Sequence, residues 1–162
     1  MSTEYETIGM DMCDIEIGDI TLLDYAYGHC DTFAMALVEQ FDYEMHVVWN
    51  LNRAYGDKRG KGIVHAYAVA RYKDQTFYFD AHGNVTYEDI QLYLSDECDS
   101  EVDEPVFKTE VISDIQGFKQ VKIKLAEQFG HSLTLDKINS DITEVISYLE
   151  KNKGSYSIKD KI

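Results

Sequence analysis

One stretch of the chain alternates between two kinds of side chain, and it restricts the fold more than any other feature. Between residues 63 and 72, bulkier or polar residues alternate with small apolar ones: His65, Tyr67, Val69 and Arg71 against Val64, Ala66, Ala68 and Ala70. A period of two predicts a strand, and the small side chains permit close packing on one face. An aromatic-rich strand is expected over 76–81, with a hairpin loop at 72–75. The pattern therefore predicts an antiparallel sheet.

Segments with helical periodicity lie before and after this hairpin in the sequence. Phe33, Leu37 and Phe41 recur at the spacing of one helix face and predict a helix over 30–41. The remaining expectations are a strand at 45–49, a loop at 50–62, a short helix at 86–94, an acidic loop at 95–104, a strand at 106–111, and helices at 114–129 and 134–152.

At 162 residues the chain fits a single domain, residues 1–162. We expect an α+β fold in which the antiparallel sheet packs on the N-terminal helix and further helices follow, within residues 106–154. Residues 1–19 are expected to form a loosely packed acidic lead-in, and residues 155–162 to fray.

The charge is strongly acidic and unevenly distributed. Thirty acidic and 15 basic residues give a net charge of −15, which repels phosphates and argues against a nucleic-acid partner. Neither a membrane-spanning apolar run nor a signal peptide is evident, and three cysteines without CxxC spacing suggest no disulfides or zinc. We therefore expect a cytoplasmic protein with no cofactor, no metal and no membrane partner.

Three side chains carry the candidate chemistry. Cys30 begins its helix, where the helix dipole and free amides favour a thiolate and could receive an oxyanion. If residues 72–75 close the hairpin, Arg71 faces Thr76, and His65 and Asp80 become diagonal neighbours on one face. Asp80 could then fix the tautomer of His65 and leave its other nitrogen for Cys30. A lone buried cysteine is usually structural, so the prediction depends on all three.

These residues also carry a resemblance to a known superfamily. GHCDTFA at 28–34, HAY at 65–67 and YFDAHG at 78–83 resemble the core of the papain-like cysteine hydrolases. The order Cys, His, Asp is most similar to the transglutaminase-like branch, over residues 23–83. The resemblance implies that Cys30 is the nucleophile, His65 the general base and acid, and Asp80 the orienting group. Asp31 stands where the family commonly has glycine.

The expected function is a cysteine-dependent acyl transfer on an amide or peptide bond through a thioester intermediate. Peptidase, deamidase and transglutaminase-type activities stay open, and the expected partner is a protein or peptide, possibly with an acidic surface. That surface would meet the basic loop near His65, which includes Lys58, Arg59 and Lys61. Further candidate substrate-binding residues are His29, Tyr67 and His82. A metal held by histidines and Cys30 is the weaker interpretation, because paired ligand spacing is missing.

Two other functions compete with this prediction. An acidic, non-enzymatic binding protein could imitate nucleic acid and block a nucleic-acid-binding partner, which suits the net charge of −15. A hydrolase-like scaffold could also retain binding without turnover. A nucleic-acid mimic needs no reactive thiol, so the reactivity of Cys30 distinguishes it from an enzyme.

Overall fold

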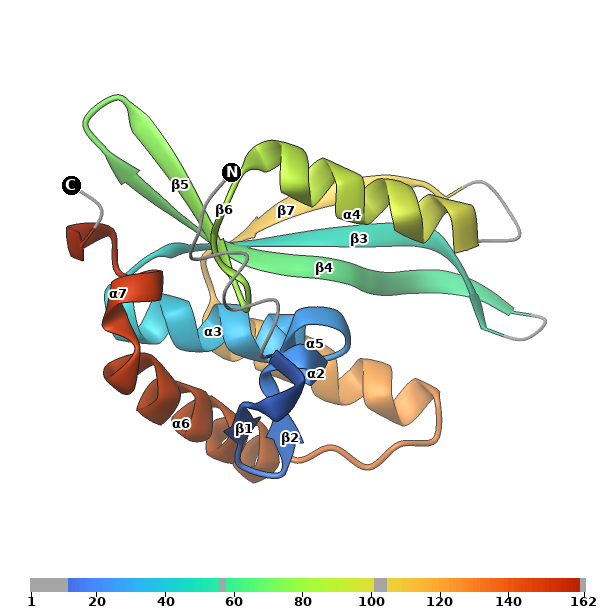
Figure 1. Cartoon of the computed structure of the whole chain (residues 1–162). Helices are drawn as coiled ribbons and strands as arrows, with labels where there is room; N and C mark the ends of the chain where they lie inside the picture. The colour runs from blue at the N-terminus through green and yellow to red at the C-terminus, as the bar shows by residue number, and fades with distance from the viewer. Residues whose placement is uncertain (1–11, 56–57, 101–104, 161–162) are drawn as a thin grey trace.

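The protein is built on a five-stranded antiparallel sheet. A computed structural model describes residues 12–55, 58–100 and 105–160. The strands lie in the order β6-β5-β4-β3-β7, and every neighbouring pair is antiparallel (Figure 1). Their bounds are β3 Glu44–Tyr55, β4 Lys58–Tyr72, β5 Gln75–Asp80, β6 Gly83–Val85 and β7 Phe107–Ile112. The expected α+β class with an antiparallel sheet and helices is confirmed.

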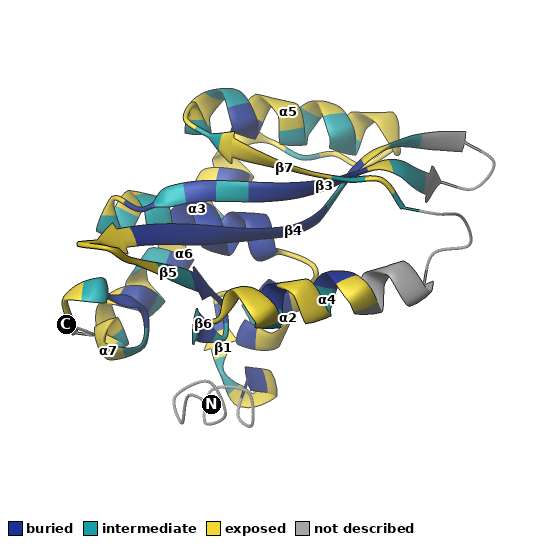
Figure 2. Ribbon diagram, turned by 90° about the horizontal axis from the view of Figure 1, so that it is seen from above, coloured by how far each residue is buried: buried dark blue, intermediate teal, exposed yellow. Residues whose placement is uncertain are grey.

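Helices cover both faces of the sheet. On one side lie α3 (Cys30–Phe41), α5 (Ile115–Gln128) and α6 (Leu135–Lys151), and on the other lies α4 (Tyr87–Ser100) (Figure 1). The large core joins α3 and α6 to the alanines of β4, whereas the smaller core joins Tyr67 and Val69 to Ile90 of α4. Figure 2 shows β4 buried along most of its length. Burial on both faces explains why residues 62–70 of β4 include no Asp, Glu, Lys or Arg.

A bulge modifies the expected alternation in β4. Val48 pairs with His65 and Trp49 with Ile63, so Val64 is the extra residue of the ladder. An extra residue shifts the side chains that follow to the opposite face. Val64 therefore packs in the smaller core with Tyr67, and not beside the alanines as the pattern predicted.

Small elements close both ends of the described chain. At the N-terminal end are a 3-10 helix (Met12–Asp14), β1 (Glu16–Ile17), β2 (Ile20–Thr21) and α2 (Leu22–Tyr27); at the C-terminal end are α7 (Lys153–Tyr156) and a 3-10 helix (Ile158–Asp160). Met12, Ile17 and Tyr156 are buried in the large core. The expected loose lead-in is therefore wrong from residue 12 onward, and the expected fraying is wrong at Tyr156. Residues 1–11 lie outside the described part.

Several predicted boundaries also need correction. The expected loop at 50–62 is wrong, because β3 continues to Tyr55 and β4 begins at Lys58, and the two strands pair with each other along this arm. The expected acidic loop is helical up to Ser100, while residues 101–104 lie outside the described part. Strand β6 was not predicted. For the strands β3, β4 and β6, pairing with neighbouring strands outweighs local composition. None of the described helices is both long and apolar enough to cross a membrane.

Candidate active site

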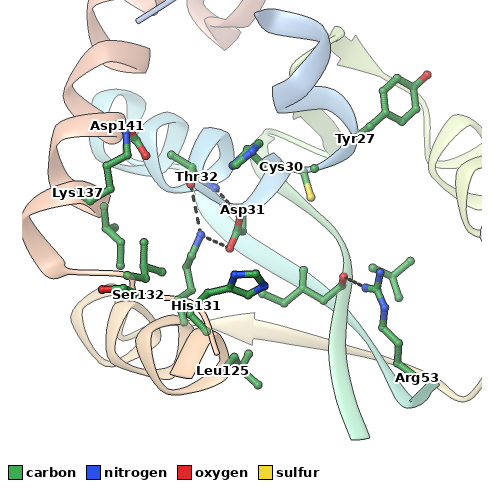
Figure 3. A pocket seen from close by; sticks show the side chains of 18 of the residues that line it. Tyr27, Cys30, Asp31, Thr32, Arg53, Leu125, His131, Ser132, Lys137 and Asp141 are labelled. Carbon is green, nitrogen blue, oxygen red and sulfur yellow. Dashed lines mark hydrogen bonds and ion pairs between the residues drawn. The ribbon is translucent and has the colours of Figure 1, made fainter. Parts of the chain in front are cut away.

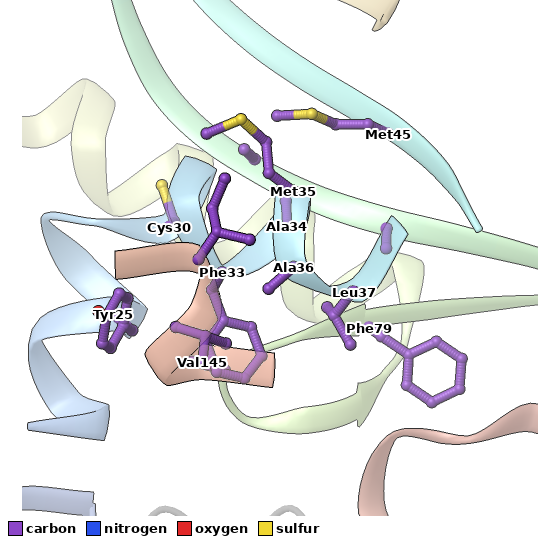
Figure 4. Close-up of a cluster of buried hydrophobic side chains, with 14 of the residues drawn as sticks. Tyr25, Cys30, Phe33, Ala34, Met35, Ala36, Leu37, Met45, Phe79 and Val145 are labelled. Carbon is purple, nitrogen blue, oxygen red and sulfur yellow. The ribbon is translucent and has the colours of Figure 1, made fainter. Parts of the chain in front are cut away.

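The turn between α2 and α3 positions Cys30. Thr21 and Asp24 form a capping box at the start of α2, and the Asp24 carbonyl then accepts hydrogen bonds from the amides of Gly28 and His29. The chain turns there, and α3 begins at Cys30. The Cys30 side chain lies at one end of the large core, with only 6% of its surface exposed (Figure 4). It nevertheless lines a cavity of about 640 Å³, so a small molecule has a route to the sulfur (Figure 3).

The first turn of α3 can bind an anion beside the sulfur. The first amides of a helix have no intrahelical acceptor. Phe33 N–H donates to the His29 carbonyl, and Thr32 N–H donates to the Asp31 carboxylate. The amides of Cys30 and Asp31 remain as donors for an oxyanion formed next to Cys30, at the positive end of the helix dipole.

Lys122 neutralises the carboxylate that follows the cysteine. Its Nζ lies 2.6 Å from Asp31 Oδ2 and 3.4 Å from Thr32 Oγ1, and both side chains of the ion pair are largely buried. An unpaired carboxylate beside a thiol would oppose thiolate formation. The ion pair offsets that effect, so Asp31 is compatible with a reactive cysteine.

The hairpin brings His65 and Asp80 together in the expected register. Arg71 pairs with Thr76, and the ladder continues to Ala68 opposite Phe79. His65 Nε2 then lies 3.3 Å from Asp80 Oδ2. The other carboxylate oxygen, Oδ1, accepts a hydrogen bond from the His82 amide at 2.8 Å and lies 3.1 Å from His82 Nδ1. Both oxygens of Asp80 are thus engaged, which fixes the carboxylate in place.

The electrostatics of this pair favour two charged groups. Burial on its own lowers the pKa of His65, but Asp80 and the Cys30 thiol outweigh it and raise that pKa to about 10. Burial on its own raises the pKa of Asp80, and the contacts with His65 and His82 reverse this effect and hold that pKa well below its ordinary value. At neutral pH the site therefore holds a protonated imidazole beside the Asp80 carboxylate.

The ring of His65 is enclosed but keeps one nitrogen available. Only 1% of His65 is exposed, and the ring of Tyr93 on α4 lies 4.5 Å from it, centroid to centroid. Among the described residues, Nδ1 has no hydrogen-bond partner. Asp80 occupies the Nε2 side, so Nδ1 is the nitrogen left to exchange a proton with a substrate at Cys30.

The catalytic candidates lie on two adjoining cavities. Cys30 lines the larger one, and His65, Asp80 and His82 line a smaller one of about 170 Å³. Tyr27 and Tyr93 line both, and their rings stack with centroids 6.0 Å apart. This tyrosine pair forms the boundary between sulfur and carboxylate, and it closes the imidazole off from solvent.

The C-terminal segment supports the strand end that carries Asp80. Tyr156 is fully buried, and its hydroxyl donates a 2.9 Å hydrogen bond to the carbonyl of Ala81, the residue after Asp80. Tyr43 OH donates to the Tyr156 carbonyl and accepts from the Ile158 amide. Residues 156–158 thus form part of the wall behind the site.

The other expected binding residues are more scattered. His29 lines the larger cavity and His82 the smaller, while Tyr67 is buried with its ring centroid 5.9 Å from that of His65. Lys61 lies over the ring of Trp49, 3.8 Å from its centroid, in a different groove. Lys58 and Arg59 belong to β4, but their side chains lie outside the described part.

Sequence reasoning missed Lys122 and Tyr93, which line the larger cavity. Arg53 also lines it, and it is the first residue of the basic loop at 53–61 that was expected to border the cleft. Nothing local distinguishes Lys122 or Tyr93, because each reaches the site through the packing of its helix. Arg53 had a usable signal, since it is the first basic residue of the chain and falls in the segment that leads to His65.

No cluster of three or more His, Cys, Asp or Glu side chains in the described ranges has an arrangement that could hold a metal ion. No protein-family model, curated protein or solved structure matches the chain. The inference of function therefore depends on the geometry of the site and on the sequence resemblance.

Proposed function

We propose that the protein is a cysteine-dependent acyl-transfer enzyme acting on an amide or peptide bond. The observation that carries the proposal is the Asp80–His65 pair, 3.3 Å apart and buried, together with a cysteine at a helix N-terminus that helps to raise the pKa of the imidazole. A structural cysteine needs no imidazole, and a buried structural histidine needs no thiol. The combination is what thiol catalysis requires.

In this mechanism Cys30 begins as a thiolate paired with the His65 imidazolium. Its sulfur attacks the carbonyl carbon, and a C–S bond forms while the oxygen becomes negative. The amides of Cys30 and Asp31 receive the oxyanion. Nδ1 of the His65 imidazolium gives its proton to the leaving nitrogen as the C–N bond breaks, which leaves a thioester. Water, or an amine in transfer, then attacks the thioester with His65 taking its proton, and the C–S bond breaks to restore the thiolate. Asp80 stays ionised and orients the ring.

The papain-like fold of the transglutaminase-like branch belongs to this proposal. Its support is the order of elements: a helix that begins with the cysteine, then antiparallel strands that carry histidine and aspartate in turn. A protein or peptide substrate is proposed on the same basis, since the larger cavity is open on one side to the molecular surface.

Thiol alkylation tests the proposal without knowledge of the substrate. Native protein is treated with a limiting amount of iodoacetamide near pH 7, and labelling at each cysteine is followed by peptide mass spectrometry. We expect Cys30 to react faster than Cys13, although Cys13 is exposed and Cys30 is buried. His65→Ala should slow labelling of Cys30 by about tenfold or more, since it removes the positive charge that favours the thiolate. Cys30→Ala should abolish the fast phase.

Cys13 serves as the internal reference for an ordinary thiol. Equal, slow labelling of all cysteines in wild type and His65→Ala would contradict the proposal and favour the acidic mimic. Fast labelling of Cys30 without a hydroxylamine-sensitive acyl adduct from any peptide or amide library would instead indicate a scaffold that has lost turnover.

A further inference from the structure

Strand β7 lies at one edge of the sheet, and most of its side chains are exposed. It pairs with β3 on one side, and no other described strand pairs with it on the other side (Figure 2). Residues 108–111 are exposed, and the two end residues of the strand are half-buried. An edge strand presents a row of backbone N–H and C=O groups that can pair with another chain. At six residues, β7 has the usual length of a strand and could pair along its whole length.

Apolar side chains gather along this edge. Val106 and Val111 are 50% and 51% exposed, and Val121 on α5 is 40% exposed. Val111 and Val121 line a groove of about 360 Å³ between β7 and α5, and the buried rings of Trp49 and Phe118 line it as well. Exposed apolar side chains next to a strand edge are typical of a surface that another chain covers.

An antiparallel pairing of β7 with its own copy allows few registers. In an antiparallel pair, two opposite residues point their backbone groups either toward each other or away from each other. These directions alternate along a strand, so a two-fold pairing of identical strands must be centred on a residue and not on a peptide bond. In the middle of β7 the possible centres are Lys108, Thr109 and Glu110.

Charge selects Thr109 as the centre. A pairing centred on Lys108 puts two lysines opposite each other, and one centred on Glu110 puts two glutamates opposite each other. Like charges that face each other directly destabilise a ladder. A pairing centred on Thr109 instead puts Lys108 of each copy opposite Glu110 of the other. The remaining opposed pairs match as well: Thr109 with Thr109, Phe107 with Val111, and Val106 with Ile112.

We propose that the protein forms a two-fold dimer in which the β7 strands of two copies pair antiparallel about Thr109 and join both sheets into one. The partner at this edge is a second copy, because the pattern of charged and apolar residues matches its own reverse. The net charge of −15 on each copy opposes association, but charges more than about 8 Å apart are largely screened at physiological ionic strength. The proposal does not depend on the enzymatic activity proposed above.

Charge reversal across the two strands tests the dimer. In analytical ultracentrifugation of the wild type at physiological ionic strength, the mass should rise from 18.6 kDa toward twice that value over about a hundredfold range of concentration. Lys108→Glu and Glu110→Lys each put like charges opposite each other in both pairs. We therefore expect each substitution alone to weaken dimerisation by about tenfold or more.

An equal mixture of these two variants is the most specific measurement. In a mixed dimer, one chain contributes two acidic side chains at positions 108 and 110 and the other contributes two basic ones. Both pairs then have opposite charges again, so the mixture should associate about as tightly as the wild type. The double variant Lys108→Glu/Glu110→Lys should also dimerise, since it exchanges the two charges. Misfolding of a single variant could not produce this recovery.

Lys151→Glu is the matched control, because Lys151 is exposed and belongs to α6 instead of β7. It changes the net charge as much as Lys108→Glu does and should leave dimerisation near the wild-type value. Amide hydrogen exchange gives a second measurement: raising the concentration of wild type should slow exchange within residues 107–112. A monomer at every concentration, equal effects of Lys108→Glu and Lys151→Glu, or a mixture that associates no better than its components would each overturn the proposal.

Discussion

The buried Asp80–His65 pair makes stability depend on pH in a defined direction. The folded protein raises the pKa of His65 from 6.5 to about 10, so its contribution to stability is complete below pH 6.5 and is lost as the pH rises toward 10. Asp80 has a lowered pKa, so its contribution is complete above its ordinary value of 3.8 and is lost in acid. The pair therefore contributes most between about pH 4 and 6.5.

This dependence can be measured by urea unfolding of Cys30→Ala at several pH values. The alanine is used because ionisation of the thiol would otherwise add its own pH dependence to the free energy of unfolding. We expect the free energy of unfolding to fall as the pH rises above 6.5, by up to about 1.4 kcal/mol per pH unit, over a shorter pH range than in the wild type because Cys30 no longer helps to raise the pKa of His65. In Cys30→Ala/Asp80→Asn the imidazole loses its carboxylate, and the slope should largely disappear. Parallel pH profiles for the two variants would contradict a charged His65.

The ion pair at the start of α3 gives a second prediction. Lys122→Met leaves the Asp31 carboxylate buried and unpaired beside Cys30, which should lower stability by about 3 kcal/mol and slow alkylation of Cys30. Asp31→Asn in the same chain removes that charge, so the double variant should recover most of the alkylation rate. Thermal unfolding and iodoacetamide kinetics give the two readouts, and a double variant as slow as Lys122→Met would contradict this role for the pair.

At the scale of residues, the sequence was most informative where contacts are local. The register of one short hairpin relates His65 to Asp80, and alternation with turn length suffices to predict it. Lys122 could not be predicted in the same way, because its contact with Asp31 depends on how α5 packs near the start of α3, 91 positions earlier in the chain. The sequence indicated the chemistry that each residue can provide. It did not indicate which distant residue each one contacts.

At the scale of elements, the C-terminal segment behind the site is open to a direct test. Tyr156→Phe removes the hydrogen bond to the Ala81 carbonyl, so we expect a stability loss of about 1 to 3 kcal/mol and slower alkylation of Cys30. Tyr148→Phe is the matched control: Tyr148 OH lies 3.2 Å from Tyr156 OH and must be the donor there, since Tyr156 already donates to Ala81.

The control loses a hydroxyl from the same aromatic cluster without touching the chain next to Asp80. Tyr148→Phe should therefore leave the alkylation rate of Cys30 nearly unchanged at a temperature where both variants are folded. Equal slowing by the two variants would show that the segment acts through general stability alone.

The prediction of elements succeeded where the hydrophobic periodicity was strong. It failed where pairing between strands determines the secondary structure. The ends of α6 and β5, and the end of β4 at the hairpin, were predicted within a residue, whereas β4 begins five residues before the predicted start at residue 63. The arm formed by β3 and β4 was missed, because glycines and bases at 50–62 are typical of loops while the strands there pair with each other. The segment after Gly154 was assigned to a fraying tail although it contains Tyr156, whose size already favours burial.

At the scale of the whole molecule, the layers explain how an acidic chain brings three bases to one cavity. The cavity draws Arg53 from β3, Lys122 from α5 and Lys137 from α6. These bases are far apart in the sequence, and the net charge of −15 gives no sign that they share a cavity. Two of them pair there with the carboxylates of Asp31 and Asp141.

The hydrogen bond from Tyr156 also links the strand end that carries Asp80 to a late segment of the chain. Cys30, His65 and Asp80 all lie in the first half of the sequence, yet the carbonyl that follows Asp80 is held by a hydroxyl near the other end. On the ribosome, these three residues are synthesised well before that hydroxyl. The strand end that carries Asp80 therefore gains this support only after residue 156 has left the exit tunnel.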